Sequence, residues 1–354
     1  MSVAAGLLAT ALALSGAPGE DGQSAAADDR LLTARVAALV RTAHEYLVAH
    51  QNADGSFSIV RNDAAASAPV AVTALAALSL MAAGNLPDRG RHEQAVRRAV
   101  AWLVDHCDAR GYFTTDADSV SQMHGQGYAV LALSQAWGMD AGDQARRAEL
   151  RAALERGVRL IEESQDAISG GWWYEPRATS AHEGSITVCM IQALRAARDV
   201  GLQVRSQVID RALSYVRRSQ NEEDGRFRYA LRDPRTSWAL TAAALSTLNA
   251  LGEYSGEPNA KGFEALQRSD PFTGTSAYNE PFVDYGALYA AQAYWQYPDQ
   301  RPFQRWWQVF VEQCEDRRRE DGHYEEGTYG AVFGTAIVSL TLQVPQGYLP
   351  IFQR

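Results

Sequence analysis

A few ionisable residues stand where they could take part in chemistry. Asp116 and Asp118 are two residues apart, and neighbouring carboxylates repel, so that one of them can hold a proton at raised pKa and act as a general acid. Alternatively, both are solvated acids that cap a helix. His124, which is flanked by Gly125 and Gly127, is either a proton shuttle or ligand, or a histidine hydrogen-bonded at a helix end.

Two further acids stand next to apolar segments. Glu183 follows His182, and Asp284 precedes Tyr285. Either carboxylate could act on a ligand, although a helix N-terminus also stabilises an acidic side chain that has no chemical role. The candidate catalytic residues, each with a purely structural alternative, are Asp116, Asp118, His124, Glu183 and Asp284.

Aromatic side chains accumulate in the same apolar segments. Their faces can stabilise a cationic intermediate or pack against an apolar ligand, and in the simpler alternative they only fill the interior. The candidate ligand-binding residues are Trp173, Trp238, Tyr285, Tyr289 and Tyr329.

Several other kinds of active site lack their motifs. The sequence has no glycine-rich phosphate loop, no Gly-x-Ser-x-Gly elbow and no Cys/His nucleophile pair. Cys107, Cys189 and Cys314 are far apart and form neither a CxxC motif nor a disulfide framework. We therefore predict no metal ion and no cofactor.

A short turn recurs along the chain and must position these residues. In each copy an aromatic residue follows a glycine by two positions, and the first four glycines are 54 to 60 residues apart. The last interval is 97 residues, close to two periods, which predicts a degenerate copy within it. The five copies are Gly55-Ser56-Phe57, Gly111-Tyr112-Phe113, Gly171-Trp172-Trp173, Gly225-Arg226-Phe227 and Gly322-His323-Tyr324.

Each turn separates two kinds of segment. Before it, apolar residues recur at helical spacing on one side only, as between Val36 and Leu47, which predicts an amphipathic helix. After it, the chain is apolar nearly all round, as in residues 70–82, which predicts a helix buried on every side. About six such hairpins predict an all-α fold, an α/α toroid with an inner and an outer ring of helices. An open solenoid is the alternative.

The turn Gln51–Phe57, with the pattern Gln-x-x-Asp-Gly-x-Phe, resembles the QW-type repeat of the squalene–hopene cyclase and prenyltransferase superfamily. The resemblance covers residues 33–344 and implies an α/α toroid with a central cavity. The segments Gly170–Tyr174, Glu183–Thr187 and Tyr348–Arg354 are similar to bacterial prenyltransferase/squalene-oxidase-repeat proteins of uncharacterised function.

The catalytic acid motifs of that superfamily are not found in this sequence. Its Asp-x-Asp-Asp box has its nearest counterpart in Asp116-Ala117-Asp118-Ser119, where serine takes the fourth place, and the Asp-Cys-Thr box is absent. The resemblance therefore implies an apolar, isoprenoid-like small-molecule ligand and leaves open whether the protein is an enzyme.

Composition narrows the possible partners. The formal net charge is −9, which argues against nucleic acid or an anionic membrane surface as the main partner, because phosphate binding needs clustered Lys and Arg. Beyond the N-terminus no segment reaches the ~20 apolar residues needed to cross a bilayer, so we predict no transmembrane helix. The sequence does not identify a protein partner.

The N-terminus predicts a leader over residues 1–29. An apolar run from Val3 to Leu14 is followed by small residues up to Ala27, as in an export signal, although no Lys or Arg precedes Arg30. A disordered leader is the alternative. We expect residues 30–354 to form a single domain, exported to the periplasm or cell envelope.

Three functions fit these observations. The protein binds or transforms an isoprenoid-like ligand in its central cavity, or it is a non-catalytic scaffold at the cell envelope. In the third hypothesis it acts on a polysaccharide with paired carboxylates drawn from Asp116, Glu183 and Asp284. A narrow, wholly apolar centre would exclude this third function.

Overall fold

The computed structural model describes residues 20–57, 67–118, 122–139, 144–253, 255–273 and 282–353. Most of the predicted leader, residues 1–19, lies outside the described residues, and residues 20–29 belong to the first helix.

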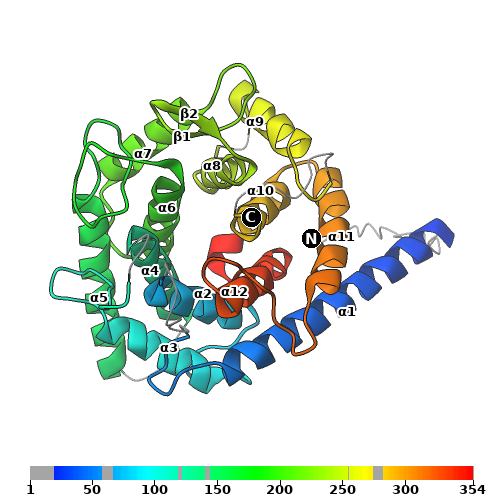
Figure 1. Cartoon of the computed structure of the whole chain (residues 1–354), viewed down its shortest axis with the longest axis horizontal. Coiled ribbons are helices and arrows are strands. Elements are labelled where there is room, and N and C mark those ends of the chain that lie inside the picture. Colours follow the sequence, from blue (N-terminus) through cyan, green and yellow to red (C-terminus); the bar gives the residue numbers. More distant parts are fainter. Residues whose placement is uncertain are drawn as a thin grey trace, which may run out of the picture.

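The helices of these segments form two concentric rings (Figure 1). The outer ring contains α1 (Glu20–Ala49), α3 (Glu93–Asp105), α5 (Gln144–Glu163), α7 (Ser206–Ser219), α9 (Glu257–Arg268) and α11 (Arg301–Arg317). The inner ring contains α2 (Pro69–Ala82), α4 (Gln122–Met139), α6 (Gly184–Asp199), α8 (Trp238–Ala250), α10 (Val283–Gln296) and α12 (Ala331–Thr341). Each inner helix packs against the next, and α12 packs against α2, so the ring is closed. The predicted α/α toroid of six hairpins is confirmed, and an open solenoid is excluded.

The two rings differ in polarity as the sequence predicted. Every residue of the inner helix α2 is buried. The outer helix α7 buries one stripe only, formed by Val208, Ala212, Tyr215, Val216 and Ser219. A helix with one apolar stripe can cover the core while its other side faces water, whereas a helix without a polar side must lie inside.

The turn glycines allow neighbouring hairpins to approach closely. Gly111 has φ +93°, and a Cβ atom there would lie 2.2 Å from the carbonyl oxygen of Arg156 on α5. Gly322 has φ +92°, and its Cβ would lie 2.6 Å from the carbonyl oxygen of Thr42 on α1. The last turn therefore rests on the first helix, which closes the outer ring.

The third turn is displaced by one residue from the prediction. Its left-handed glycine is Gly170, with φ +83°, and not Gly171. The buried aromatic residue is accordingly Trp172, while Trp173 is partly exposed. Two consecutive glycines make both positions possible in the sequence. At Gly170 a Cβ atom would lie 2.2 Å from the carbonyl oxygen of Arg211 on α7, so the left-handed position needs a glycine here as it does in the other turns.

A side chain of the following inner helix holds the buried aromatic residue of most turns. In four turns a threonine Oγ1 accepts a hydrogen bond from the aromatic backbone N–H. The pairs are Phe57–Thr73 (3.0 Å), Trp172–Thr187 (3.2 Å), Phe227–Thr241 (3.2 Å) and Tyr324–Thr335 (3.0 Å). In the second turn Gln126 Oε1 accepts from Phe113 at 3.0 Å. In the degenerate turn Asp270 accepts from Phe272 at 2.8 Å.

A small β-hairpin, which the sequence analysis did not predict, follows the fourth turn. Strands β1 (Arg228–Ala230) and β2 (Asp233–Thr236) pair in antiparallel fashion between α7 and α8. The hairpin brings Tyr229 and Arg235 to the end of the ring at which the inner helices begin.

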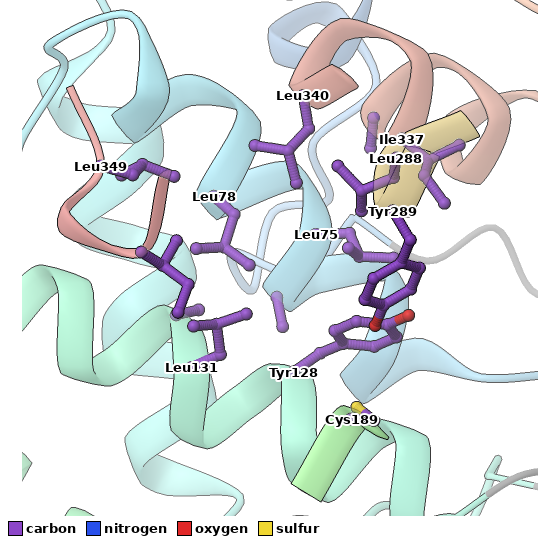
Figure 2. Packing of buried hydrophobic residues seen from close by; sticks show 14 of the residues in the cluster. Leu75, Leu78, Tyr128, Leu131, Cys189, Leu288, Tyr289, Ile337, Leu340 and Leu349 are labelled. Carbon is purple, nitrogen blue, oxygen red and sulfur yellow. The ribbon is translucent and has the colours of Figure 1, made fainter. Parts of the chain in front are cut away.

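The C-terminal segment covers the other end of the ring. Two short 3₁₀ helices, η1 (Val344–Gln346) and η2 (Pro350–Phe352), follow α12, and the C-terminus lies at the centre of Figure 1. Leu349, Ile351 and Phe352 are buried there. Figure 2 shows Leu349 in the same apolar cluster as Leu78 and Leu131, which lie on inner helices.

Candidate functional site

A partly enclosed cavity of about 370 Å³ lies where the inner helices begin. This volume is within the range of small-molecule sites. The first turns of the inner helices and the β-hairpin form its walls, and most of the lining is apolar. The aromatic lining residues include Tyr128, Tyr174, Tyr229, Tyr285, Tyr329 and Phe333.

Glu183 is the N-cap of α6 and is fully buried at the cavity wall. Its Oε2 accepts from the backbone N–H of Ser185 at 2.8 Å, and its Oε1 accepts from the N–H of Ile186 at 2.6 Å. The Ser185 hydroxyl donates to Oε1 at 2.7 Å. Burial raises the pKa of the Glu183 carboxyl, and the hydrogen bonds from Ser185 and Ile186 oppose part of that rise.

His124 lines the cavity from the first turn of α4. Its Nε2 lies 3.2 Å from Ser185 Oγ, and its ring lies near the rings of Tyr128, Tyr174 and Tyr285. Burial lowers the pKa of His124 to about 4, so the imidazole is neutral at pH 7.

The rim of the cavity carries a paired cation. The guanidinium of Arg235 lies over the Tyr229 ring, 4.6 Å from its centroid, and forms an ion pair with Asp233 at 2.6 Å. The hydroxyl groups of Tyr229 and Tyr174 are 2.8 Å apart. This contact joins the β-hairpin to the loop that precedes α6.

Three of the five candidate catalytic residues lie away from the cavity lining. Asp116 is exposed. Asp118 accepts from the backbone N–H and the hydroxyl of Thr115 at 2.8 and 3.1 Å, and burial raises its pKa. Asp284 forms an ion pair with Arg317 on α11 at 2.8 Å. The structure brings only His124 and Glu183 together at the cavity, through Ser185.

Two of the five candidate ligand-binding residues line the cavity and three do not. Tyr285 and Tyr329 line the cavity. Tyr289 is fully buried one turn further along α10, with its ring centroid 4.8 Å from that of Tyr285 (Figure 2 shows Tyr289 beside Tyr128). Trp238 is also fully buried and packs against Phe272, and Trp173 packs against Tyr174, so both lie outside the lining.

Sequence reasoning missed several lining residues. Ser185 and Tyr174 stand in segments that carried the family resemblance but were not named as site residues. Tyr229 and Arg235 are on the β-hairpin, whose turn is formed by Leu231 and Arg232 and carries no Gly, Asn or Asp that could have indicated it in the sequence.

The described residues contain no group of three or more His, Cys, Asp or Glu side chains arranged to hold a metal ion. Within the same described segments, no helix is long and apolar enough to span a bilayer.

No family model and no curated protein sequence matches this chain. Several solved structures, however, are similar to it in fold. The type II terpene cyclase MstE from Scytonema superimposes with a TM-score of 0.60 at 15% identity, over 89% of this chain and 99% of that one. A variant of the same cyclase, in complex with geranylgeranyl dihydroxybenzoate as substrate, gives a TM-score of 0.58 at 18% identity over 91% and 99%.

A glycoside hydrolase has a similar shape. The α-1,6-mannanase GH76A of Salegentibacter, an inactive variant in complex with α-1,6-mannotriose, gives a TM-score of 0.66 at 7% identity over 88% of this chain and 99% of that one. At sequence identities this low, the similarity shows a shared fold and no more. The chain thus has the α/α-toroid fold, shared with a squalene-cyclase-like terpene cyclase, that the sequence resemblance implied.

Proposed function

We propose that the cavity at the start of the inner helices binds an apolar, isoprenoid-like ligand. The observation that carries this proposal is the aromatic lining, in which tyrosine rings from α4, α10 and the β-hairpin surround one space. Such rings bury large apolar area, and each Å² of apolar surface removed from water contributes roughly 25 cal/mol. The complex of the similar terpene cyclase with a geranylgeranyl compound supports the same ligand class.

The proposal concerns binding rather than a defined reaction. Protonation of an alkene requires a strong acid that faces the ligand. Glu183 is the carboxylate among the described lining residues, and its oxygens accept three hydrogen bonds at the start of α6. Its burial raises its pKa, which makes it a weaker acid. These properties favour a structural role for Glu183 in holding the cavity wall.

A polysaccharide ligand is the second candidate, and the likeness to the α-1,6-mannanase favours it. Glycoside hydrolysis normally needs two carboxyl groups that flank the bond to be cleaved. The described lining residues supply only Glu183, because Asp116 and Asp284 lie elsewhere. The lining therefore favours the isoprenoid-like ligand.

Calorimetric titration distinguishes the two candidates. We expect saturable binding of geranylgeraniol and no binding of α-1,6-mannotriose. Tyr285→Ala removes a lining ring and should weaken binding about 10-fold or more, whereas Tyr348→Ala, the same change at an exposed tyrosine outside the lining, should leave it unaltered. Binding of the trisaccharide alone would replace the isoprenoid proposal with the polysaccharide one.

We further propose that the protein acts outside the cytoplasm. The support is the apolar run Val3–Leu14 followed by small residues. Fusion of residues 1–29 to a reporter enzyme that is active only after export tests this proposal, and an inactive fusion would refute it.

A further inference from the structure

Three polar side chains at the cavity wall form a directed chain of hydrogen bonds. The Ser185 hydroxyl lies between Glu183 Oε1, at 2.7 Å, and His124 Nε2, at 3.2 Å. Because His124 and Ser185 are 61 residues apart and belong to different inner helices, the chain joins α4 to α6. The chain uses Nε2 of the imidazole and does not involve the other ring nitrogen, Nδ1.

The direction of these hydrogen bonds follows from counting protons. Two backbone N–H groups and the Ser185 hydroxyl converge on Glu183, which favours an ionised carboxylate that accepts from all three. A hydroxyl has a single hydrogen, and that of Ser185 goes to Glu183. Ser185 Oγ must then accept from His124, so the proton of the neutral imidazole is on Nε2 and Nδ1 is an acceptor.

Nδ1 of His124 has no hydrogen-bond partner among the described residues, although the ring lines the cavity. The His124 ring is partly exposed at the cavity, so a molecule bound there can donate to this acceptor, and an acceptor that is paired with a donor is more favourable than one left without a partner when a ligand displaces water. Burial keeps the imidazole neutral at pH 7, with a pKa of about 4, so the ring offers a lone pair and not a positive charge. The partner that fits Nδ1 is therefore a hydrogen-bond donor on the ligand.

The charges around the cavity disfavour an ionised ligand. The carboxylate of Glu183 lies in the wall, and the guanidinium of Arg235 at the rim is already paired with Asp233. A diphosphate or carboxylate group would meet the negative charge of Glu183 without a free cation among the described lining residues to balance it. A neutral donor avoids that penalty.

We infer that the ligand is an isoprenoid alcohol whose hydroxyl group donates a hydrogen bond to Nδ1 of His124, while its hydrocarbon chain packs against the tyrosine rings. This inference rests on the proposed function and names the polar end of the ligand.

Titration with three matched compounds tests it. Geranylgeraniol should bind about 10-fold more tightly than its methyl ether, which has the same chain and an oxygen but no donor, and more tightly than geranylgeranyl diphosphate. Equal affinity for the alcohol and the ether overturns the inference and leaves the apolar site intact. Tightest binding of the diphosphate overturns it as well. If neither alcohol nor ether binds saturably, the proposed function itself fails.

Two variants assign the effect to His124. His124→Phe should reduce the preference for the alcohol over the ether to about 1-fold, and His182→Phe, the same change at a histidine outside the lining, should preserve it. A preserved preference in His124→Phe would refute the role of Nδ1.

Nuclear magnetic resonance provides a test that needs no variant. In the ¹⁵N-labelled wild-type protein at pH 7, two-bond ¹H–¹⁵N correlations show which ring nitrogen carries the proton. We expect the His124 proton on Nε2. A proton on Nδ1 would overturn the inference, because that nitrogen could not accept from a ligand.

Discussion

Gln126 Nε2 donates to the carbonyl oxygen of Gly111 at 2.9 Å, from an inner helix to the turn that precedes it. In three other turns the corresponding bond comes from a glutamine at the end of the outer helix. These pairs are Gln51–Gly55 (2.9 Å), Gln165–Gly170 (2.9 Å) and Gln220–Gly225 (3.1 Å). The second turn has Cys107 at that position, and Gln126 replaces both the missing glutamine and the usual threonine.

Because Gln126 has both of these roles, its loss should destabilise the protein more than the loss of Gln51. Gln126→Ala should lower the free energy of unfolding by about 2–4 kcal/mol, because the buried N–H of Phe113 and the carbonyl of Gly111 both lose their partner. Gln51→Ala should cost roughly 1 kcal/mol, since Thr73 still holds Phe57. Urea unfolding measures both values, and equal losses would contradict the double role.

The closeness of neighbouring hairpins predicts that the space around a turn glycine matters more than its φ. Gly111→Ala and Gly201→Ala both place a side chain at positive φ, +93° and +86°, which costs about 1–2 kcal/mol. Only at Gly111 would the new Cβ meet a backbone carbonyl, at 2.2 Å, whereas Gly201 has open space. We expect Gly111→Ala to reduce the free energy of unfolding by at least about 2 kcal/mol more than Gly201→Ala. Similar values would show that the outer helix shifts freely.

The ion pair between Asp284 and Arg317 predicts a structural effect. Asp284→Ala leaves the half-buried guanidinium without its partner and should lower the free energy of unfolding by roughly 1–3 kcal/mol. Affinity for geranylgeraniol should stay within about 2-fold of wild type, because Asp284 lies outside the cavity lining. A double-mutant cycle with Arg317→Met separates the pair from other effects. Loss of binding without loss of stability would restore Asp284 as a site residue.

Because His44 is buried, we expect the protein to lose stability in acid. Its ring is buried with Nε2 3.2 Å from Ser79 Oγ, and burial lowers its pKa to about 3. An unfolded histidine has a pKa of about 6.5, so between pH 6.5 and about 3 the unfolded chain binds more protons than the native one. Acidification through this window should therefore cost up to about 1.4 kcal/mol per pH unit from His44 alone.

The variant His44→Gln isolates this effect, because glutamine can hydrogen-bond to Ser79 but does not titrate. Urea unfolding at pH 7, 6 and 5 should show a smaller loss of stability per pH unit in His44→Gln than in wild type. Parallel curves for the two proteins would assign the acid sensitivity to other groups, among them His124, whose pKa burial lowers to about 4.

Local patterns in the sequence were enough to predict paired inner and outer helices. The contrast between a one-sided stripe, as on α7, and an all-round apolar segment, as in α2, fixes which helix faces water. The regular spacing of the turns then fixes the order of the hairpins. Both signals are local, because helix polarity and turn chemistry depend on residues close together in the chain. For this reason the two layers of helices could be predicted from the sequence, whereas the packing of α12 against α2 excluded an open solenoid.

The composition of the cavity wall depends on contacts between residues that are far apart in the chain. Gly170 and Gly171 are equally good turn residues in the sequence, and the structure shows that Gly170, packed against the backbone of α7, is the left-handed one. Asp118 and Glu183 both precede inner helices, yet only Glu183 reaches the cavity. The bond between Ser185 and His124 joins helices 61 residues apart. Spacing along the chain tells which helices are neighbours, but the course of each loop and the packing around each side chain determine which groups face the same space.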